Sequence, residues 1–313
     1  MIEFYKCTDK AVTAVTEKSE ANWINLTHAT LGDLENVATE LGIDPTHLAY
    51  VLDDEEYSRM VALEDNKYII VDIPAKLGGN DLMDYNTVPL SISVVGNRVV
   101  TATTVDHDLF DEATRERLVL DAKETTEVLV LKIVLTIINQ YQRLLRQIDH
   151  ERLNLENKGA SDTSKNDVIK AHQLESVIVY FETSLRSLEV VLNELKLSLP
   201  KRMISYERDL FSAVFLEVKQ AIEMASIYRN IMGNTRELLS TLIDISLNNI
   251  MKFMTSITVV MAIPTIISGF YGMNVSNDGV PFAQTINGFH IVVIISFIIS
   301  ILLAIWLRRN KWM

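Results

Sequence analysis

Two uncharged stretches near the end of the chain decide its architecture: FMTSITVVMAIPTIISGFY at residues 253–271 and FHIVVIISFIISILLAIWL at residues 289–307. Each has 19 residues, and none of them is Asp, Glu, Lys or Arg. A helix of this length extends about 28 Å, which matches the roughly 30 Å hydrocarbon core of a bilayer. The chain is therefore expected to cross a membrane twice.

The basic residues around these stretches predict their orientation. Between Lys252 and Arg308 there is no Lys or Arg. Because Lys and Arg next to a span stay in the cytoplasm, both termini are expected there, with residues 272–288 as a short outer loop. Trp306 and Trp312 stand where interfacial anchors belong. The N-terminal sequence shows no apolar core of signal-peptide length, so no cleaved secretory signal is expected.

The remainder of the chain is acidic and long enough for one substantial soluble core. Residues 1–251 carry 40 acidic and 25 basic side chains, a net charge of −15. Such a surface repels nucleic acid and anionic lipid, because both need Lys and Arg to replace their counterions. It should collect cations instead. The single cysteine, Cys7, excludes an internal disulfide framework and fits a reducing compartment.

Residues 1–122 mix short strand and helix signals and are expected to form a cytoplasmic α/β domain. Residues 68–73 and 90–95 are rich in β-branched side chains, and Gly96-Asn97 between two Val-Val pairs predicts a hairpin turn. Residues 31–41 place apolar side chains at helical spacing and are followed by a glycine, which predicts a helix. The strand order cannot be read from these patterns.

Helical periodicity takes over after residue 122. Residues 123–199 are expected to form a helical hairpin of the cytoplasmic domain, broken at the polar stretch 158–162. The apolar run 128–138 has only 11 residues and contains Lys132, so it predicts a buried soluble helix rather than a span. Residues 200–271 are expected to form a stalk helix that continues into the first span, and residues 289–313 the second span with a basic tail.

Apolar residues recur every seven positions along the predicted stalk. The two series are Phe211, Val218, Ala225, Met232, Leu239 and Val214, Ala221, Tyr228, Thr235, Leu242. Such a stripe suits packing against identical helices in a bundle. It equally suits a helix that buries one face on its own domain, and the pattern leaves both interpretations open.

A second periodic face runs along the first span and its inner entrance. Its small and polar residues alternate three and four apart and so share one side of a helix: Asn248, Met251, Thr255, Thr258, Ala262, Thr265 and Gly269. Such a face either lines a dry helix contact or, in several copies, surrounds water. Pro264 in the same span cannot donate to the carbonyl of Val260, and a freed carbonyl fits a pore lining.

The most specific signal is Tyr271-Gly272-Met273-Asn274, directly after the first span. A Gly-Met-Asn triplet in this place is the signature of the CorA family of divalent-cation channels, which the chain resembles. Residues 248–255 are similar to the family's Asn-x-x-Met-Lys-x-x-Thr stretch, and residues 308–312 to its basic tail. Residues 23–26 and the acidic run 52–56 resemble its soluble domain, so the likeness covers essentially the whole chain.

The resemblance implies an α+β cytoplasmic domain with a long stalk helix and two C-terminal transmembrane helices, assembled as a funnel-shaped homopentamer. Residue by residue, Gly272 and Met273 would shape a turn that presents a selectivity ring of Asn274. The conduction path would be lined by Asn248, Met251, Met254, Thr255, Thr258, Ala262, Thr265 and Gly269. Two departures exist: only Asp278 supplies the acidic character that many members have in the outer loop, and Ala262 replaces a bulkier Met of some members.

An amide ring suits the chemistry of Mg²⁺, which gives up its water reluctantly. Five neutral oxygens can hydrogen-bond to the water shell without stripping it and without holding the ion too tightly. The sequence leaves simpler roles open for Asn274, which could be a turn residue or, with Val275 and Ser276, a glycosylation sequon.

The sequence therefore predicts a membrane channel for Mg²⁺, with Co²⁺ and Ni²⁺ carried opportunistically and no cofactor besides the ion. Cytoplasmic Mg²⁺ is expected to close it through the acidic domain, with Glu207, Asp209 and Glu217 as candidate ligands. A zinc transporter of the same superfamily is the first alternative. A membrane-tethered enzyme is the second, although no phosphate-binding Gly-x-x-x-x-Gly-Lys loop, His-x-x-x-His pair or nucleophile elbow is present.

Overall fold

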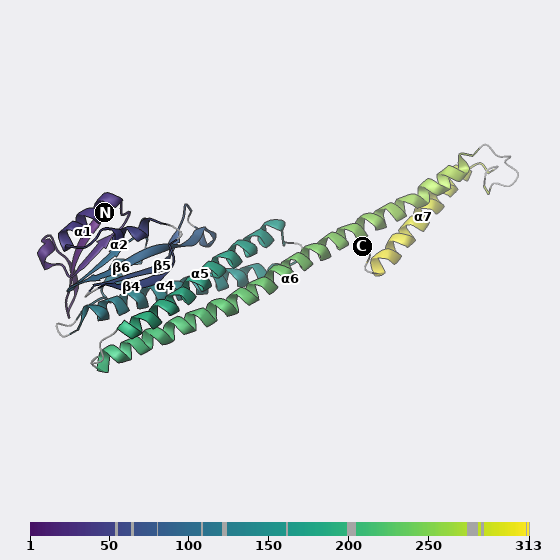
Figure 1. Ribbon diagram of the computed structural model, residues 1–313. Helices are drawn as coiled ribbons and strands as arrows, with labels where there is room; N and C mark the ends of the chain where they lie inside the picture. The colour runs from purple at the N-terminus through teal and green to yellow at the C-terminus, as the bar shows by residue number, and fades with distance from the viewer. Residues whose placement is uncertain are drawn as a thin grey trace. The chain divides into compact units, whose positions relative to one another are not determined.

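The strand-forming stretches near the N-terminus pair into one seven-stranded sheet in the computed structural model (Figure 1). It describes residues 1–53, 56–63, 66–79, 81–107, 109–120, 124–160, 162–198, 205–273, 281–282, 285–310 and 312. The strands are β1 (Ile2–Cys7), β2 (Val12–Ala14), β3 (Trp23–Leu26), β4 (Arg59–Leu63), β5 (Asn66–Lys76), β6 (Tyr85–Val95) and β7 (Arg98–Ala102). Their order is β2-β1-β3-β7-β6-β5-β4, antiparallel except for the parallel pair β3 and β7.

The predicted hairpin turn and N-terminal helix are both confirmed. Gly96 joins β6 to β7 at φ +55°, a left-handed conformation that glycine adopts without strain. Helix α1 (Leu31–Leu41) begins at Thr30, whose side-chain oxygen accepts from the Asp33 amide while the Asp33 carboxylate accepts from the Thr30 amide. It ends at Gly42, which is again left-handed.

The other helices are α2 (Thr46–Ala49), α3 (Glu112–Arg115), α4 (Thr126–Glu156), α5 (Lys165–Ser198), α6 (Ser205–Tyr271) and α7 (Gly288–Arg309). Short 3₁₀ turns η1 (Lys18–Glu20), η2 (Tyr50–Leu52) and η3 (Leu82–Asp84) complete the described elements. The chain divides into two units, Met1–Asn157 with Asn166–Glu237, and Lys158–Lys165 with Leu238–Met313. The first unit holds the α+β fold that was predicted for the N-terminal part of the chain.

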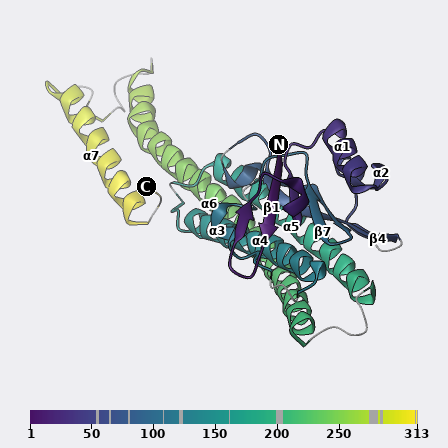
Figure 2. The same ribbon diagram turned by 90° about the vertical axis from the view of Figure 1, so that its left-hand side faces the viewer.

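Helices cover both faces of the sheet in the first unit (Figure 2). Helices α1 and α2 bury Leu34 and Leu48 against Ile24 and Val100 of the central strands. On the other face, Tyr141 of α4 donates its hydroxyl to the Asp72 carbonyl of β5 at 3.0 Å. The Tyr141 ring also meets Phe181 of α5 edge-on, with 5.1 Å between centroids. Helix α5 also reaches this face directly, because Ser184 donates its hydroxyl to the Asp72 carboxylate of β5 at 2.8 Å.

The apolar run 128–138 lies in α4, as predicted for a buried helix of the soluble part. By length and composition alone, three helices of the described residues could cross a membrane: α4, α6 and α7. The apolar window of α4 is 67% buried in the structure, against 6% for α6 and 17% for α7. The ammonium group of Lys132 is satisfied at the edge of the core, where it donates to Glu124 at 3.1 Å and to the Val119 carbonyl. The burial assigns α4 to the core of the first unit.

The seven-residue stripe of α6 is buried on its own domain. Phe211, Val218, Ala225 and Met232 are each at most 6% exposed in the single chain. Three ion pairs join the same part of α6 to α5: Glu175 with Arg236 at 3.1 Å, Glu182 with Arg229 at 2.9 Å and Glu189 with Lys219 at 3.9 Å. This supports the second interpretation of the stripe, because the face that would pack against identical helices is already occupied between residues 211 and 232.

Candidate functional site

In the second unit, α7 packs along the C-terminal part of α6 through small polar residues (Figure 1). Ser256 of α6 is 1% exposed and donates to the Trp312 carbonyl at 3.0 Å. On α7, Ser296 and Ser300 are buried and donate to the carbonyls four residues before them, each at 2.9 Å. Small side chains let two helices approach closely, so these buried serines suit close packing of the two spans.

The predicted conduction face lies on the opposite side of α6. Ser256 and Ile267 face α7, whereas Thr255, Thr258 and Thr265 are exposed in the single chain. At 100° per residue, the centres of the two faces are roughly 180° apart around the helix. The other predicted lining residues are Asn248, Met251, Met254 and Gly269, which are exposed, and Ala262, which is half-buried. The small-residue stripe therefore lies on the side of α6 away from α7.

Two threonines of this face satisfy their hydroxyl donors on their own helix. Thr258 donates to the Met254 carbonyl at 2.9 Å, and Thr265 donates to the Met261 carbonyl at 3.0 Å. A hydroxyl has one donor and two lone pairs, so each oxygen keeps the capacity to accept. The water shell of a cation points its hydrogens outward. The face therefore offers acceptors of the kind that a hydrated cation needs.

Helix α6 ends directly at the signature triplet. Gly272 donates its amide to the Ser268 carbonyl at 2.9 Å and, at 3.2 Å, to the Gly269 carbonyl, which closes the last turn. The Tyr271 hydroxyl donates to the Pro281 carbonyl across the outer segment. Met273 is exposed, and Asn274 lies outside the described residues, as does Asp278. The roles of Gly272, Met273 and Asn274 in a filter stay predictions.

Pro264 packs on the side of α6 that faces α7. It lines a cavity of about 220 Å³ between α6 and α7, together with Ile267, Phe289 and Val292. The Pro264 ring is therefore on the α7 side of α6, and the role of the freed Val260 carbonyl in a pore lining stays a prediction. Thr265, its neighbour in the chain, is 100° further around the helix. Adjacent residues can therefore serve opposite surfaces.

The three candidate regulatory carboxylates are not brought together in one chain. Glu207 is buried and accepts from the Thr125 hydroxyl at 3.0 Å, whereas Glu217 accepts from the Gln142 amide at 2.8 Å. Ten residues of α6, about 15 Å, separate them, and Asp209 between them is exposed. Among the residues that the structure describes, no three His, Cys, Asp or Glu side chains are grouped so that they could hold a metal. Their role as metal ligands stays a prediction.

Sequence reasoning missed the contact between the two spans. Ser256, Ser296 and Ser300 lie at it, and only the pair Ser296 and Ser300, four apart on an apolar helix, carries a sequence signal.

Cys7 is buried in β1, and burial raises the pKa of its thiol to about 12. It therefore stays protonated and is unsuited to metal binding or nucleophilic chemistry.

Comparisons with known proteins identify the family of this chain and proteins of similar fold. The chain matches the family described as CorA-like Mg²⁺ transporter protein over residues 18–309. It is 26% identical over 297 residues to the cobalt/magnesium transport protein CorA of Methanocaldococcus jannaschii, covering 93% of this chain and 90% of that protein. Identity to the cobalt/magnesium transport protein CorA of Thermotoga maritima is 23% over 319 residues, covering 99% and 88%. The complete structure of the CorA magnesium transporter from M. jannaschii is similar in fold, with a TM-score of 0.76 at 24% identity, covering 100% of this chain and 99% of that chain.

Proposed function

Because the chain belongs to the family of CorA-like Mg²⁺ transporters, we propose that it is a channel that conducts Mg²⁺, and with it Co²⁺ and Ni²⁺, across the membrane. Its C-terminal helices make it a membrane protein, with spans in the C-terminal part of α6 and in α7. Membership of a transporter family excludes the membrane-tethered enzyme. With the basic residues at the inner flanks, both termini lie in the cytoplasm.

The observation that carries the proposal is the exposed small and polar face of α6, opposite α7. Lipid would leave the acceptor lone pairs of Thr258 and Thr265 without partners, because polar groups in the membrane normally face protein or water. Several copies that turn this face toward a common axis would place it against water instead. The free lone pairs of Thr258 and Thr265 would then accept from the shell of a passing ion.

Selectivity in this proposal comes from a ring of Asn274. Helix α6 ends at Tyr271, so each copy would place the triplet at the outer end of the conduction path. Amide oxygens accept hydrogen bonds from the water shell of Mg²⁺ and hold it weakly enough for release. Gly272 and Met273 supply the turn that presents the amide.

Ion uptake into liposomes that contain only this protein tests the proposal. We expect Mg²⁺ to enter down its gradient and Co²⁺ to compete with it. The zinc alternative predicts the opposite preference, so uptake is compared for Mg²⁺ and Zn²⁺ at equal concentration. Uptake of Zn²⁺ without uptake of Mg²⁺ would show that the conducted ion is Zn²⁺ rather than Mg²⁺. Empty liposomes provide the control for leakage.

The assembly that we propose is a homopentamer. The detergent-solubilised protein should give a mass of five chains in native mass spectrometry, because one polar face per chain requires several copies to enclose a path. A spectrum dominated by monomer or dimer would contradict this assembly.

We further propose that cytoplasmic Mg²⁺ closes the channel. The net charge of −15 on residues 1–251 repels its copies until cations screen or bridge them, so binding to one state shifts the population. Current in excised patches should fall as Mg²⁺ on the cytoplasmic side rises through millimolar concentrations. Asp209→Asn should weaken this response, whereas Glu35→Gln, an equal charge change on the exposed side of α1, should not. Current that is indifferent to Mg²⁺ would rule out the regulation and leave the channel itself in place.

A further inference from the structure

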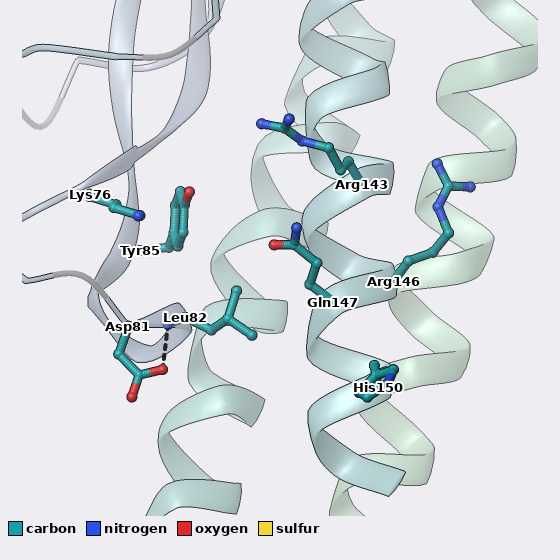
Figure 3. Close-up of a pocket in the computed structure, with 8 residues that line it drawn as sticks. All are labelled: Lys76, Asp81, Leu82, Tyr85, Arg143, Arg146, Gln147 and His150. Carbon is teal, nitrogen blue, oxygen red and sulfur yellow. Dashed lines mark hydrogen bonds between the residues drawn. The ribbon is translucent and has the colours of Figure 1, made fainter. Parts of the chain in front are cut away.

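The first unit contains a cavity of about 640 Å³ with no part in the proposed conduction path (Figure 3). Lys76 at the end of β5 and Tyr85 at the start of β6 line one side. The exposed face of α4 lines the other, with Arg143, Arg146, Gln147 and His150 three, four and seven residues apart. This spacing places all four residues on one side of the helix.

The charge of this cavity is opposite to that of the domain around it. Residues 1–251 carry a net charge of −15, yet Lys76, Arg143 and Arg146 meet here with a single lining carboxylate, Asp81. That carboxylate is directed into its own turn, where it accepts from the Leu82 amide at 2.7 Å (Figure 3). The cavity therefore presents a local excess of positive charge, which a concave surface focuses.

The three cations lack carboxylate partners within the described part of the chain. None of Lys76, Arg143 and Arg146 lies within 4.0 Å of a described Asp or Glu oxygen. The charge of Arg143 helps to lower the pKa of Asp111, but the two groups form no ion pair. Elsewhere on α4 the basic side chains are paired: Lys132 with Glu124 at 3.1 Å, and Arg152 with Asp149 at 2.8 Å. Arg143 and Arg146 are exposed, and Lys76 lies over the Tyr85 ring at 5.5 Å from its centroid, so all three charges are available to an anion in the cavity.

The side chains are directed to suit such an anion. In Figure 3, Arg143 and Gln147 point from α4 toward the strand side, where Lys76 and Tyr85 lie. Arg146 points to the other side of α4 in this view, away from the strands, and His150 lies further along the same helix. Seven residues of helix give the row of donors a length of about 10 Å, which exceeds a single phosphate group. The planar fork of arginine binds phosphate oxygens in pairs, and lysine adds a point charge.

We propose that this cavity binds a polyphosphate chain, either free or as part of a nucleoside triphosphate. Arg143 and Lys76 would hold the polyphosphate from opposite sides, and the Gln147 amide would donate between them. The volume lies within the range of about 300–1,000 Å³ that is typical of small-molecule sites, so a nucleoside also has room.

Isothermal titration of the full-length protein in detergent tests the proposal, with EDTA present so that metal-bound phosphate does not contribute. Tripolyphosphate and ATP are titrated separately, and inorganic phosphate serves as the short-chain comparison. We expect saturable binding of tripolyphosphate, weakened by salt. Arg143→Gln should weaken it at least about tenfold, because a charge-assisted hydrogen bond is lost. Arg117→Gln removes the same charge from an exposed position outside the cavity and should leave the affinity unchanged.

The outcomes are separable. If ATP binds at least as tightly as tripolyphosphate, the site is one for a nucleoside triphosphate. If tripolyphosphate binds more tightly than ATP, the ligand is free polyphosphate. No saturable binding of either, equal affinity for inorganic phosphate, or an equal loss in Arg117→Gln would overturn the proposal. Arg143 is exposed, so an unchanged melting temperature of Arg143→Gln shows that any loss comes from the site.

Discussion

Uptake of Mg²⁺ into liposomes should be abolished by Asn274→Ala, while the mass of the assembly and its melting temperature stay those of the wild type. In the proposed assembly, the substitution removes one amide oxygen per copy at the outer end of the path, so a whole ring of acceptors would be lost at once. Without it the water shell of Mg²⁺ has no fixed partners there. Uptake is measured with a fluorescent Mg²⁺ indicator inside the liposomes.

A matched control is available in the same loop. Asn277→Ala makes the same chemical change three residues further on, outside the signature triplet, and should leave uptake near the wild-type rate. Wild-type uptake in Asn274→Ala would return Asn274 to the status of a turn residue. Equal loss in both variants would indicate a general requirement of the outer loop rather than a ring at Asn274.

Ala262→Phe should block conduction nearly completely. Ala262 is the smallest side chain with a Cβ on the predicted conduction face, and it lies on the side of α6 that α7 leaves uncovered. In the proposed pentamer, five added rings at one level of the path would fill space that a hydrated ion needs. Uptake in liposomes should fall to the rate of empty liposomes, with the native mass unchanged.

The control for this variant adds the same ring to the other span. Ile298 of α7 is exposed and, like Ala262, lies about ten residues, roughly 15 Å, from the outer end of its helix. Ile298→Phe should retain uptake, because α7 is expected in the outer ring. Full uptake in Ala262→Phe would show that this face of α6 does not line the path and would favour its use as a dry contact between copies.

Local sequence patterns determined the boundaries of several helices and turns of this protein. The ends of the two spans were predicted at Tyr271 and Phe289, and the helices end at Tyr271 and begin at Gly288. Hydropathy and charge are properties of neighbouring residues, so such boundaries need no knowledge of the rest of the chain. The same holds for the Gly96 turn and for the helix that Thr30 and Gly42 delimit.

The tertiary structure alone decided what each face meets. Strands β3 and β7 pair in parallel although more than seventy residues separate them, and no local pattern specifies that partner. The stripe of α6 was readable as a buried face, but its partners proved to be α4 and α5 of the same chain. Pro264 and Thr265 face different surfaces because α7 packs on one side only. Periodicity states that a surface is covered or polar, whereas the identity of its partner depends on contacts between distant parts of the chain.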